Sequence, residues 1–199
     1  MTTLARVAQL WVFPVKSMAG AAVDSADVGP AGLAGDRSWA VVDRTGQPVT
    51  AAAEPRLREV VPRIEHRDLR LDVPGAPPGL EVESAAEALS DWLGRPLHLA
   101  FRDDGGFVDV APLHVVSTAS TADAQHAEEC DTCDVATPRA NLVLDLEPGT
   151  GSERDWVGRS LRAGTATLSV VRLPKHCLGV YAEVTVPGSV RVGDVVSAD

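Results

Sequence analysis

Long apolar runs are absent from this sequence of 199 residues, and none approaches the roughly 18 consecutive apolar residues that a helix needs to span a bilayer. Residues 1–6 also lack the charged start, the long apolar centre and the small-residue cleavage site of a secretory signal. Both absences favour a cytoplasmic protein without a membrane partner.

Positive charge is scarce as well. The chain has 18 basic and 28 acidic residues, which gives a net charge of −10. Divided at residue 98, it has 10 bases and 13 acids before that point and 8 bases and 15 acids after it. Because a nucleic-acid-binding surface needs an excess of positive charge, we expect no nucleic-acid partner. A local basic pocket for a small anion remains compatible with this composition.

Cysteine occurs only three times, an odd count that does not suggest the disulfide framework of a secreted protein. Cys130 and Cys133 form a CxxC pair in an acidic stretch, which we interpret as an exposed loop. A zinc site would need two more ligands, of which His126 is one candidate, and a redox dithiol usually has cations around it. A metal or disulfide clip, or a resolving partner for Cys177, stays open. A Ser-His-Asp arrangement, a P-loop and a Rossmann fingerprint are also missing.

Many short apolar runs between Gly/Pro turns predict a mainly β protein with minor α, of the barrel or sandwich type. Strands are expected at residues 4–13, 23–28, 38–43, 47–50, 56–61, 69–73, 97–102, 107–110, 114–117, 141–146, 165–172, 181–186 and 194–197.

Two helices are expected. The first, over residues 85–93, should begin with a capping box of Ser84 and Glu87 and end at Gly94. A second helix is expected from about residue 118 to residue 129, capped by a hydroxyl side chain.

The stretch around Cys177 contains the clearest sign of chemistry. The β-branched run 168–171 predicts a buried strand, and Pro174 should end it because proline has no N–H for the ladder. Cys177 then follows Lys175 and His176, and nearby cations favour the thiolate form of cysteine. The plainer alternative is that Cys177 is a small buried hydrophobic residue.

Five segments of the sequence fall into one order: residues 13–17, 35–39, 107–114, 138–142 and 175–177, with 156–158 and 193–194 fitting the same pattern. In this order they resemble the MOSC family, named for the C-terminal domain of molybdenum-cofactor sulfurase. The mitochondrial amidoxime-reducing component is similar in its two-part layout. The resemblance implies a MOSC β-barrel over residues 99–199 and a smaller N-terminal β-barrel-like domain over residues 1–98.

The resemblance also implies a role for Cys177, either as a persulfide carrier or as a ligand of molybdenum. The molybdenum cofactor is a pterin with a dithiolene and a terminal phosphate. Its site needs cations for the phosphate, amides and hydroxyls for the pterin edge, and a soft thiolate ligand for the metal. Pyridoxal phosphate is a lesser candidate ligand, and binding of no cofactor at all is the other alternative.

With Cys177 as the catalytic residue and metal ligand, the residues expected to bind the cofactor are Lys16, Ser17, Arg37, Asp109, Ser117, Thr118, Ser120, Arg139, Asn141, Lys175 and His176. Lysine offers phosphate a point charge and arginine a bidentate fork. Hydroxyls before a helix can cradle an anion. Arg139 and Asn141, two residues apart, should point to one face.

These assignments have plainer structural alternatives. Lys16 could be a solvated lysine at a strand end, Arg37 could pair with Asp36, and Asp109 could be an exposed strand residue. The hydroxyls near residue 118 could cap the next helix and do nothing else.

Three functions follow from the resemblance. The first is a molybdenum-cofactor protein that reduces N-hydroxylated compounds with electrons from a redox partner. The second is a molybdenum-free sulfur carrier or transferase, in which Cys177 takes sulfur from a small sulfur-containing substrate or a cysteine-desulfurase partner. The third is a non-catalytic binding module. Bound metal would identify the first, and a mass gain of one sulfur atom on Cys177 the second.

Overall fold

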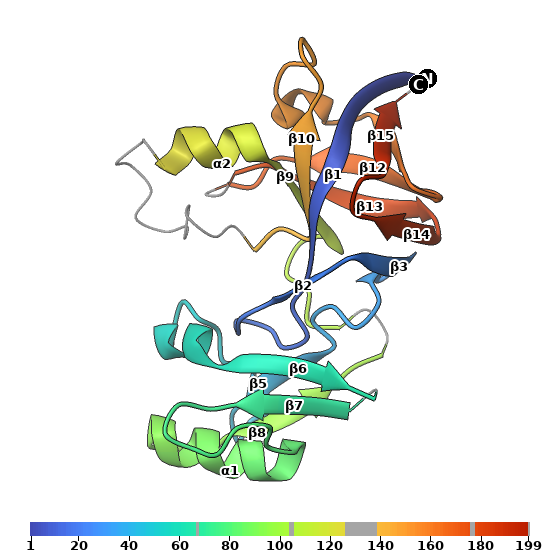
Figure 1. Cartoon of the computed structure of the whole chain (residues 1–199). Helices are drawn as coiled ribbons and strands as arrows, with labels where there is room; N and C mark the ends of the chain where they lie inside the picture. The colour runs from blue at the N-terminus through green and yellow to red at the C-terminus, as the bar shows by residue number, and fades with distance from the viewer. Residues whose placement is uncertain (67, 104–105, 126–138, 176–177, 199) are drawn as a thin grey trace. The chain divides into compact units, whose positions relative to one another are not determined.

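The computed structural model describes residues 1–66, 68–103, 106–125, 139–175 and 178–198 (Figure 1). Backbone contacts divide the chain into two compact units. Unit 1 contains residues 1–11, 22–34 and 109–199, and unit 2 contains residues 12–21 and 35–108. Each unit combines segments that are separated in the sequence. The expected domain ranges 1–98 and 99–199 stay predictions.

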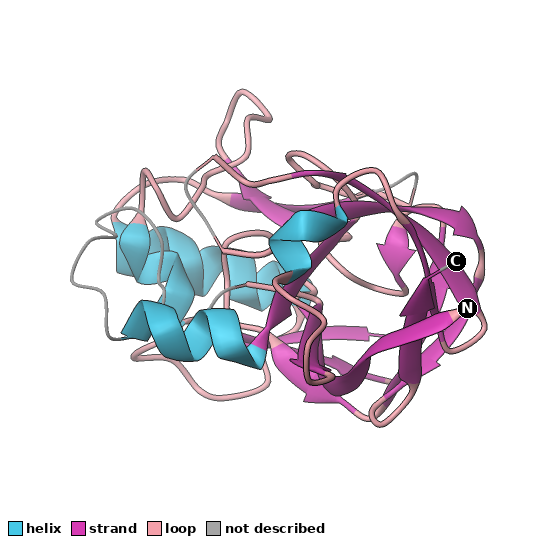
Figure 2. Ribbon diagram, turned by 90° about the horizontal axis from the view of Figure 1, so that it is seen from above, coloured by secondary structure: helices cyan, strands magenta, loops and turns pink. Residues whose placement is uncertain are grey.

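Unit 1 is built on a closed barrel of seven strands. Around the barrel these are β10 (Leu142–Leu146), β9 (Leu113–Ser117), β13 (Val180–Val186), β12 (Ala166–Arg172), β11 (Ser160–Ala163), β15 (Val195–Ala198) and β1 (Thr2–Val12), which pairs again with β10. Neighbours are antiparallel except β9 and β10, which are parallel. A parallel pair needs a crossover connection, and α2 (Thr118–Gln125) begins it. The first and last strands run side by side, since Thr2 pairs with Ala198 (Figure 2).

Alternating polarity explains why these segments form barrel strands. In β12, Ala166, Leu168 and Val170 are buried, whereas Thr167 and Ser169 are only partly buried. Successive side chains of a strand point to opposite faces, so the apolar set fills the interior. All five residues of β9 are buried instead, and α2 packs against both β9 and β10.

Three further pieces belong to the described fold beside the barrel. The short strand β2 (Ala21–Val23) adds to β1. A separate sheet contains β14 (Gly188–Arg191), β3 (Ser25–Gly29) and β4 (Gly32–Leu33). The one-turn helix η2 (Glu153–Trp156) precedes β11.

Unit 2 contains two antiparallel strand pairs, a 3-10 helix and an α-helix. The pairs are β5 (Trp39–Val42) with β8 (His98–Phe101) and β6 (Val61–Glu65) with β7 (Asp68–Asp72), and the helices are η1 (Pro55–Glu59) and α1 (Val82–Leu93). Figure 1 shows α1 beside β7 and β8, and the structure records contacts of α1 with both strands. Helix α1 buries Ala85, Leu89 and Leu93, which are spaced by four residues along one face.

The fold-class prediction, mainly β with minor α and a β-barrel, is confirmed. Helix α1 begins three residues earlier than expected, with Glu81 as its N-cap and no side-chain cap, so the predicted capping box at Ser84 is wrong. Gly94 does end the helix, with φ of 68°. In the ranges that the structure describes, no helix is long and apolar enough to cross a membrane.

Several strand predictions need correction. The segment predicted as a strand at 56–61 is mostly the 3-10 helix η1, because Pro55 favours a helical start and Leu57 turns into the core. Residues 107–110 form turns and bends rather than a strand, and 47–50 contributes only an isolated bridge from Pro48 to Val42.

The turn after β5 is held by one carboxylate. Oδ1 of Asp43 accepts hydrogen bonds from the Thr45 hydroxyl at 2.6 Å, from Thr45 N at 2.8 Å and from Gln47 N at 3.0 Å. These hydrogen bonds hold the pKa of Asp43 below its ordinary value of 3.8, and the bond from the Thr45 side chain has the largest effect. The lowered pKa means that the ionised carboxylate is preferred in the folded protein.

Replacement of Asp43 by asparagine should therefore lower the melting temperature at neutral pH. The contribution of this charge is fully present above the unfolded-state pKa and is lost as the pH falls through the lowered pKa of the folded state. Melting curves of wild type and Asp43→Asn should accordingly converge in acid. A melting-temperature difference that stays constant down to pH values below 3.8 would contradict this account of the turn.

Candidate functional site

Lys16 is a buried cation of unit 2. Its side chain lies just after β1, is 7% exposed, and donates from Nζ to the carbonyl oxygen of Phe107 at 3.0 Å. Its backbone N donates to Trp39 O at 2.8 Å. The alternative of a solvated lysine at a strand end is therefore wrong.

Arg37 lies in the same cluster. Its guanidinium forms an ion pair with Asp36 and lies 5.2 Å from the centre of the Phe13 ring. The buried Asp36 also accepts from Phe13 N at 2.7 Å, so this carboxylate both orients the arginine and anchors the end of β1. The ion-pair alternative for Arg37 is thus present in the structure, which leaves phosphate binding by Arg37 a prediction.

Backbone bonds join the three segments of this cluster. Arg37 N donates to Phe13 O at 2.7 Å, and Phe107 N donates to Arg37 O at 2.8 Å. Both Arg37 and Ser17 have a positive φ, of 50° and 69°, which L-residues rarely adopt. Unit 2 therefore brings the cations of Lys16 and Arg37 and the carboxylate of Asp36 together around Phe13 and Phe107, and the Arg102 guanidinium lies 4.4 Å from the centre of the Phe107 ring.

Asn141 of unit 1 is a structural tie. It is fully buried; its Oδ1 accepts from His114 N at 3.1 Å and its Nδ2 donates to Trp11 O at 3.2 Å. Its backbone N donates to His114 O at 2.8 Å. The side chain thus holds β1, β9 and the start of β10 together, and its predicted role toward a cofactor stays a prediction.

The hydroxyls at the start of α2 also bond within unit 1. Ser117 is buried, and its Oγ accepts from Ser120 N at 3.0 Å and donates to Ser120 Oγ at 3.0 Å. Thr118 Oγ1 donates to Asp145 Oδ1 at 2.7 Å. The capping alternative is therefore observed for Ser117, and cofactor binding by these hydroxyls stays a prediction.

A small apolar cluster brings the predicted segments of unit 1 together. Buried Val116, Ala140 and Val143 pack with the partly buried Trp11 and Leu178. These residues adjoin the predicted positions: Val116 precedes Ser117, Ala140 lies between Arg139 and Asn141, and Leu178 follows Cys177. In addition, Leu178 O lies 2.7 Å from Nε2 of His114.

Other predicted residues either lie outside the described part of the chain or are not fully buried. His176, Cys177, Cys130, Cys133 and His126 lie outside the described residues. Lys175 is exposed; Asp109 is exposed and lies on a bend; Arg139 is half-buried. Within the described ranges, no group of three or more His, Cys, Asp or Glu side chains could hold a metal ion.

Two residues at the foot of the β12–β13 hairpin were missed by the sequence analysis. The half-buried Arg154, from η2, donates from Nη1 to Gly179 O at 3.5 Å. Gly179 has φ of 75°, and a Cβ there would lie 2.1 Å from Val115 O. The glycine two residues after Cys177 was a usable signal for a close backbone approach. Arg154 gave none, because its partner lies 25 residues further along the chain.

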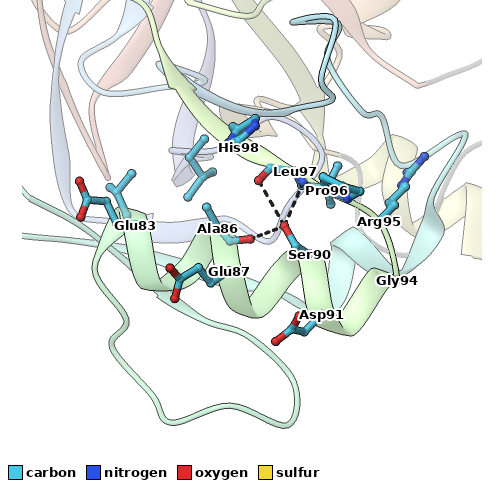
Figure 3. A pocket seen from close by; sticks show the side chains of 12 residues that line it. Glu83, Ala86, Glu87, Ser90, Asp91, Gly94, Arg95, Pro96, Leu97 and His98 are labelled. Carbon is cyan, nitrogen blue, oxygen red and sulfur yellow. Dashed lines mark hydrogen bonds between the residues drawn. The ribbon is translucent and has the colours of Figure 1, made fainter.

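A groove of about 980 Å³ lies elsewhere on unit 2, between α1 and the segment 94–99 (Figure 3). Its helical wall carries Glu83, Glu87 and Asp91, and Ser90 Oγ bridges to Ala86 O at 2.7 Å and to Leu97 N at 2.9 Å. None of the predicted site residues lines this groove, so the groove is not the site that the sequence predicted.

Comparison with known proteins places the first half of the chain in a family. Residues 4–99 match the family model of the MOSC N-terminal beta barrel domain. This match, together with the similarity to the proteins described next, confirms the resemblance that the ordered motifs indicated.

The similar curated proteins are amidoxime-reducing components. The chain is 38% identical over 76 residues to mitochondrial amidoxime reducing component 2 of Rattus norvegicus, which is 36% of this chain and 22% of that protein. It is 47% identical over 55 residues to mitochondrial amidoxime-reducing component 1 of Homo sapiens, which is 26% of this chain and 16% of that protein. The matched stretches thus span about a fifth of the relatives' length.

A solved structure, that of the YUAD protein from Bacillus subtilis, aligns over 97% of this chain and 94% of that one. Its TM-score of 0.47 and its identity of 13% are too low to support an assignment of function.

Gly179 offers a test of how tightly the hairpin foot is packed. Gly179→Ala should lower the free energy of unfolding by more than the roughly 1–3 kcal/mol that a strained backbone costs, because the new methyl group would meet Val115 O. Gly193→Ala is the matched control, since φ there is 90° and a Cβ would meet no atom within 4 Å. Urea unfolding of both variants measures the difference, and equal losses would show that Gly179 is needed for its φ alone.

Proposed function

We propose that this protein binds the molybdenum cofactor and reduces N-hydroxylated compounds, with Cys177 as the molybdenum ligand and with electrons supplied by a separate redox protein. The observation that carries the proposal is the MOSC N-terminal domain over residues 4–99, together with the identity to amidoxime-reducing components. The matched stretches cover only about a fifth of those proteins, so their activity is extended to this chain as a proposal.

The donor set of unit 2 fits an anionic group. A terminal phosphate requires cations, and Lys16 and Arg37 provide two, each already oriented by a protein acceptor, Phe107 O for the lysine and Asp36 for the arginine. Groups that are held in place before binding lose less entropy when a ligand arrives. We therefore assign Lys16 and Arg37 to the phosphate, with the hydroxyl of Ser17 next to them in the chain.

In unit 1, Arg139 and Cys177 would face the cofactor, while Asn141 and Ser117 chiefly hold the strands that carry them. A thiolate is a soft ligand suited to molybdenum. When bound, the cofactor supplies the centre through which electrons reach the substrate. The protein's own part is to hold that group, to exclude bulk water and to deliver protons.

Cys177→Ala should abolish molybdenum binding while the fold is kept. The protein would be produced in a host that makes the cofactor, and metal content and released pterin fluorescence would be measured. We expect near-stoichiometric molybdenum in wild type, little in Cys177→Ala, and wild-type content in the control Cys130→Ala.

Two outcomes would contradict the assignment. Unchanged molybdenum and turnover in Cys177→Ala would remove Cys177 from the site. Absence of molybdenum from wild type, with a gain of one sulfur atom on Cys177 in intact-mass analysis, would make the protein a sulfur carrier instead.

Lys16→Ala and Arg139→Ala should each weaken cofactor retention without removing the site. A hydrogen bond to a charged group contributes about 1.5–3 kcal/mol, so the dissociation constant should rise roughly 10- to 100-fold. Pterin loss during gel filtration measures this, with Arg44→Ala, an exposed arginine in a turn, as the control. Equal retention by all three variants would refute the cofactor-binding roles of Lys16 and Arg139.

A further inference from the structure

Two buried side chains of η2 each have a polar atom without a partner. Glu153 is 0% exposed and Trp156 is 1% exposed. Glu153 Oε2 accepts from the hydroxyl of Ser152 at 3.5 Å. In contrast, Oε1 of Glu153 and Nε1 of Trp156 have no hydrogen-bond partner in the part of the chain that the structure describes. Buried polar atoms are nearly always satisfied, so such exceptions point to a bound water, an ion or a functional role.

The geometry of η2 places the two side chains on one side of the turn. A 3-10 helix has three residues per turn, so side chains at positions i and i+3 eclipse each other, and Glu153 and Trp156 have that spacing. Ser152 and Asp155 fix the start of the turn through a reciprocal capping box. An acceptor and a donor therefore enter the interior from the same turn. One water molecule can bridge them by accepting from the indole N–H and donating to the carboxylate.

The segment of η2 is attached to both ends of the hairpin between β12 and β13. Just after the turn, Gly158 N donates to Val170 O at 2.8 Å. Within the turn, Arg154 Nη1 donates to Gly179 O at 3.5 Å. Cys177, which lies outside the described residues, precedes Gly179 by two positions in the sequence. The turn with the buried carboxylate is thus bound to the hairpin that carries the proposed metal ligand.

We propose that Glu153 is a proton-relay residue for the reduction, acting through a water molecule held between its carboxylate and the Trp156 indole. This inference rests on the proposed function. The reaction R–NHOH + 2 e⁻ + 2 H⁺ → R–NH₂ + H₂O breaks the N–O bond, forms an N–H bond and releases the oxygen as water. The redox partner supplies both electrons, and the two protons pass inward from Glu153. The half-buried hydroxyl of Ser152, bonded to Oε2, connects the carboxylate to solvent for reprotonation.

The bridging water is tested without molybdenum or substrate. In ¹⁵N-labelled protein, the Trp156 indole proton, assigned through Trp156→Phe, should show a cross-peak to a long-lived water molecule. The Trp11 indole, which donates to Gln9 Oε1 at 2.9 Å, is the internal control and should show none. Absence of the water cross-peak at Trp156 would overturn the proposal.

The relay itself is tested by Glu153→Gln, which keeps the shape of the side chain but cannot carry a proton. We expect turnover to fall at least about 100-fold, because general acid–base catalysis usually contributes that much, with KM and molybdenum content unchanged. The solvent deuterium isotope effect on turnover should rise, and Glu153→Asp should restore part of the rate. Glu183→Gln is the control, since it makes the same chemical change at an exposed carboxylate of β13 that the relay does not use.

The remaining outcomes separate this inference from the proposed function. An active wild type with unchanged turnover in Glu153→Gln would overturn the relay and leave the proposed function standing. Loss of molybdenum from Glu153→Gln would show a structural role and overturn the relay as well. A wild type without molybdenum or reductase activity would overturn the proposed function, and the relay with it.

Discussion

The pairing of β1 with both β10 and β15 is the interaction on which unit 1 depends. Ala5 is paired with Leu146 on one side and with Val196 on the other, so strands from the start, middle and end of the chain meet in one ladder. Because a closed barrel has no free edge, each strand is fixed by two neighbours. The register shifts of β1 on both sides are local irregularities of the kind that let a strand bend around a barrel.

Much of this fold could be predicted from the sequence where the information is local. The β-branched run within residues 165–172 located β12 to within one residue, and Gly94 located the end of α1. Elements that exist because of distant partners were missed or misplaced. Strand β11 has little pattern of its own and is formed by pairing with β12 and β15. The true start of α1 at Glu81 has no capping side chain that a sequence pattern could show.

The same distinction between local information and long-range contacts applies to the candidate site. Residue type and motif order indicated Lys16 and Arg37, but not that Lys16 is buried against Phe107, 91 residues away. Nor could residue type show that the Asn141 amide is occupied by Trp11 and His114. A buried amide or hydroxyl must find hydrogen-bond partners, and the scaffold is often the nearest source. Polar residues that residue type alone suggests as ligand contacts are therefore frequently hydrogen-bonded to the protein itself.

The hairpin between β12 and β13 shows how contacts within the fold can hold the two ends of a loop. Its second foot is held by the close approach of Gly179 to Val115 and by the contact of Leu178 O with His114, and its first foot by the bond from Gly158 to Val170. These constraints come from β9 and from the segment after η2, so the described residues at both ends of the loop are held by contacts within the protein. Glu153 and Trp156 are buried in η2, and a buried polar atom costs free energy unless it is hydrogen-bonded, so the water molecule proposed between them would remove that cost for both side chains.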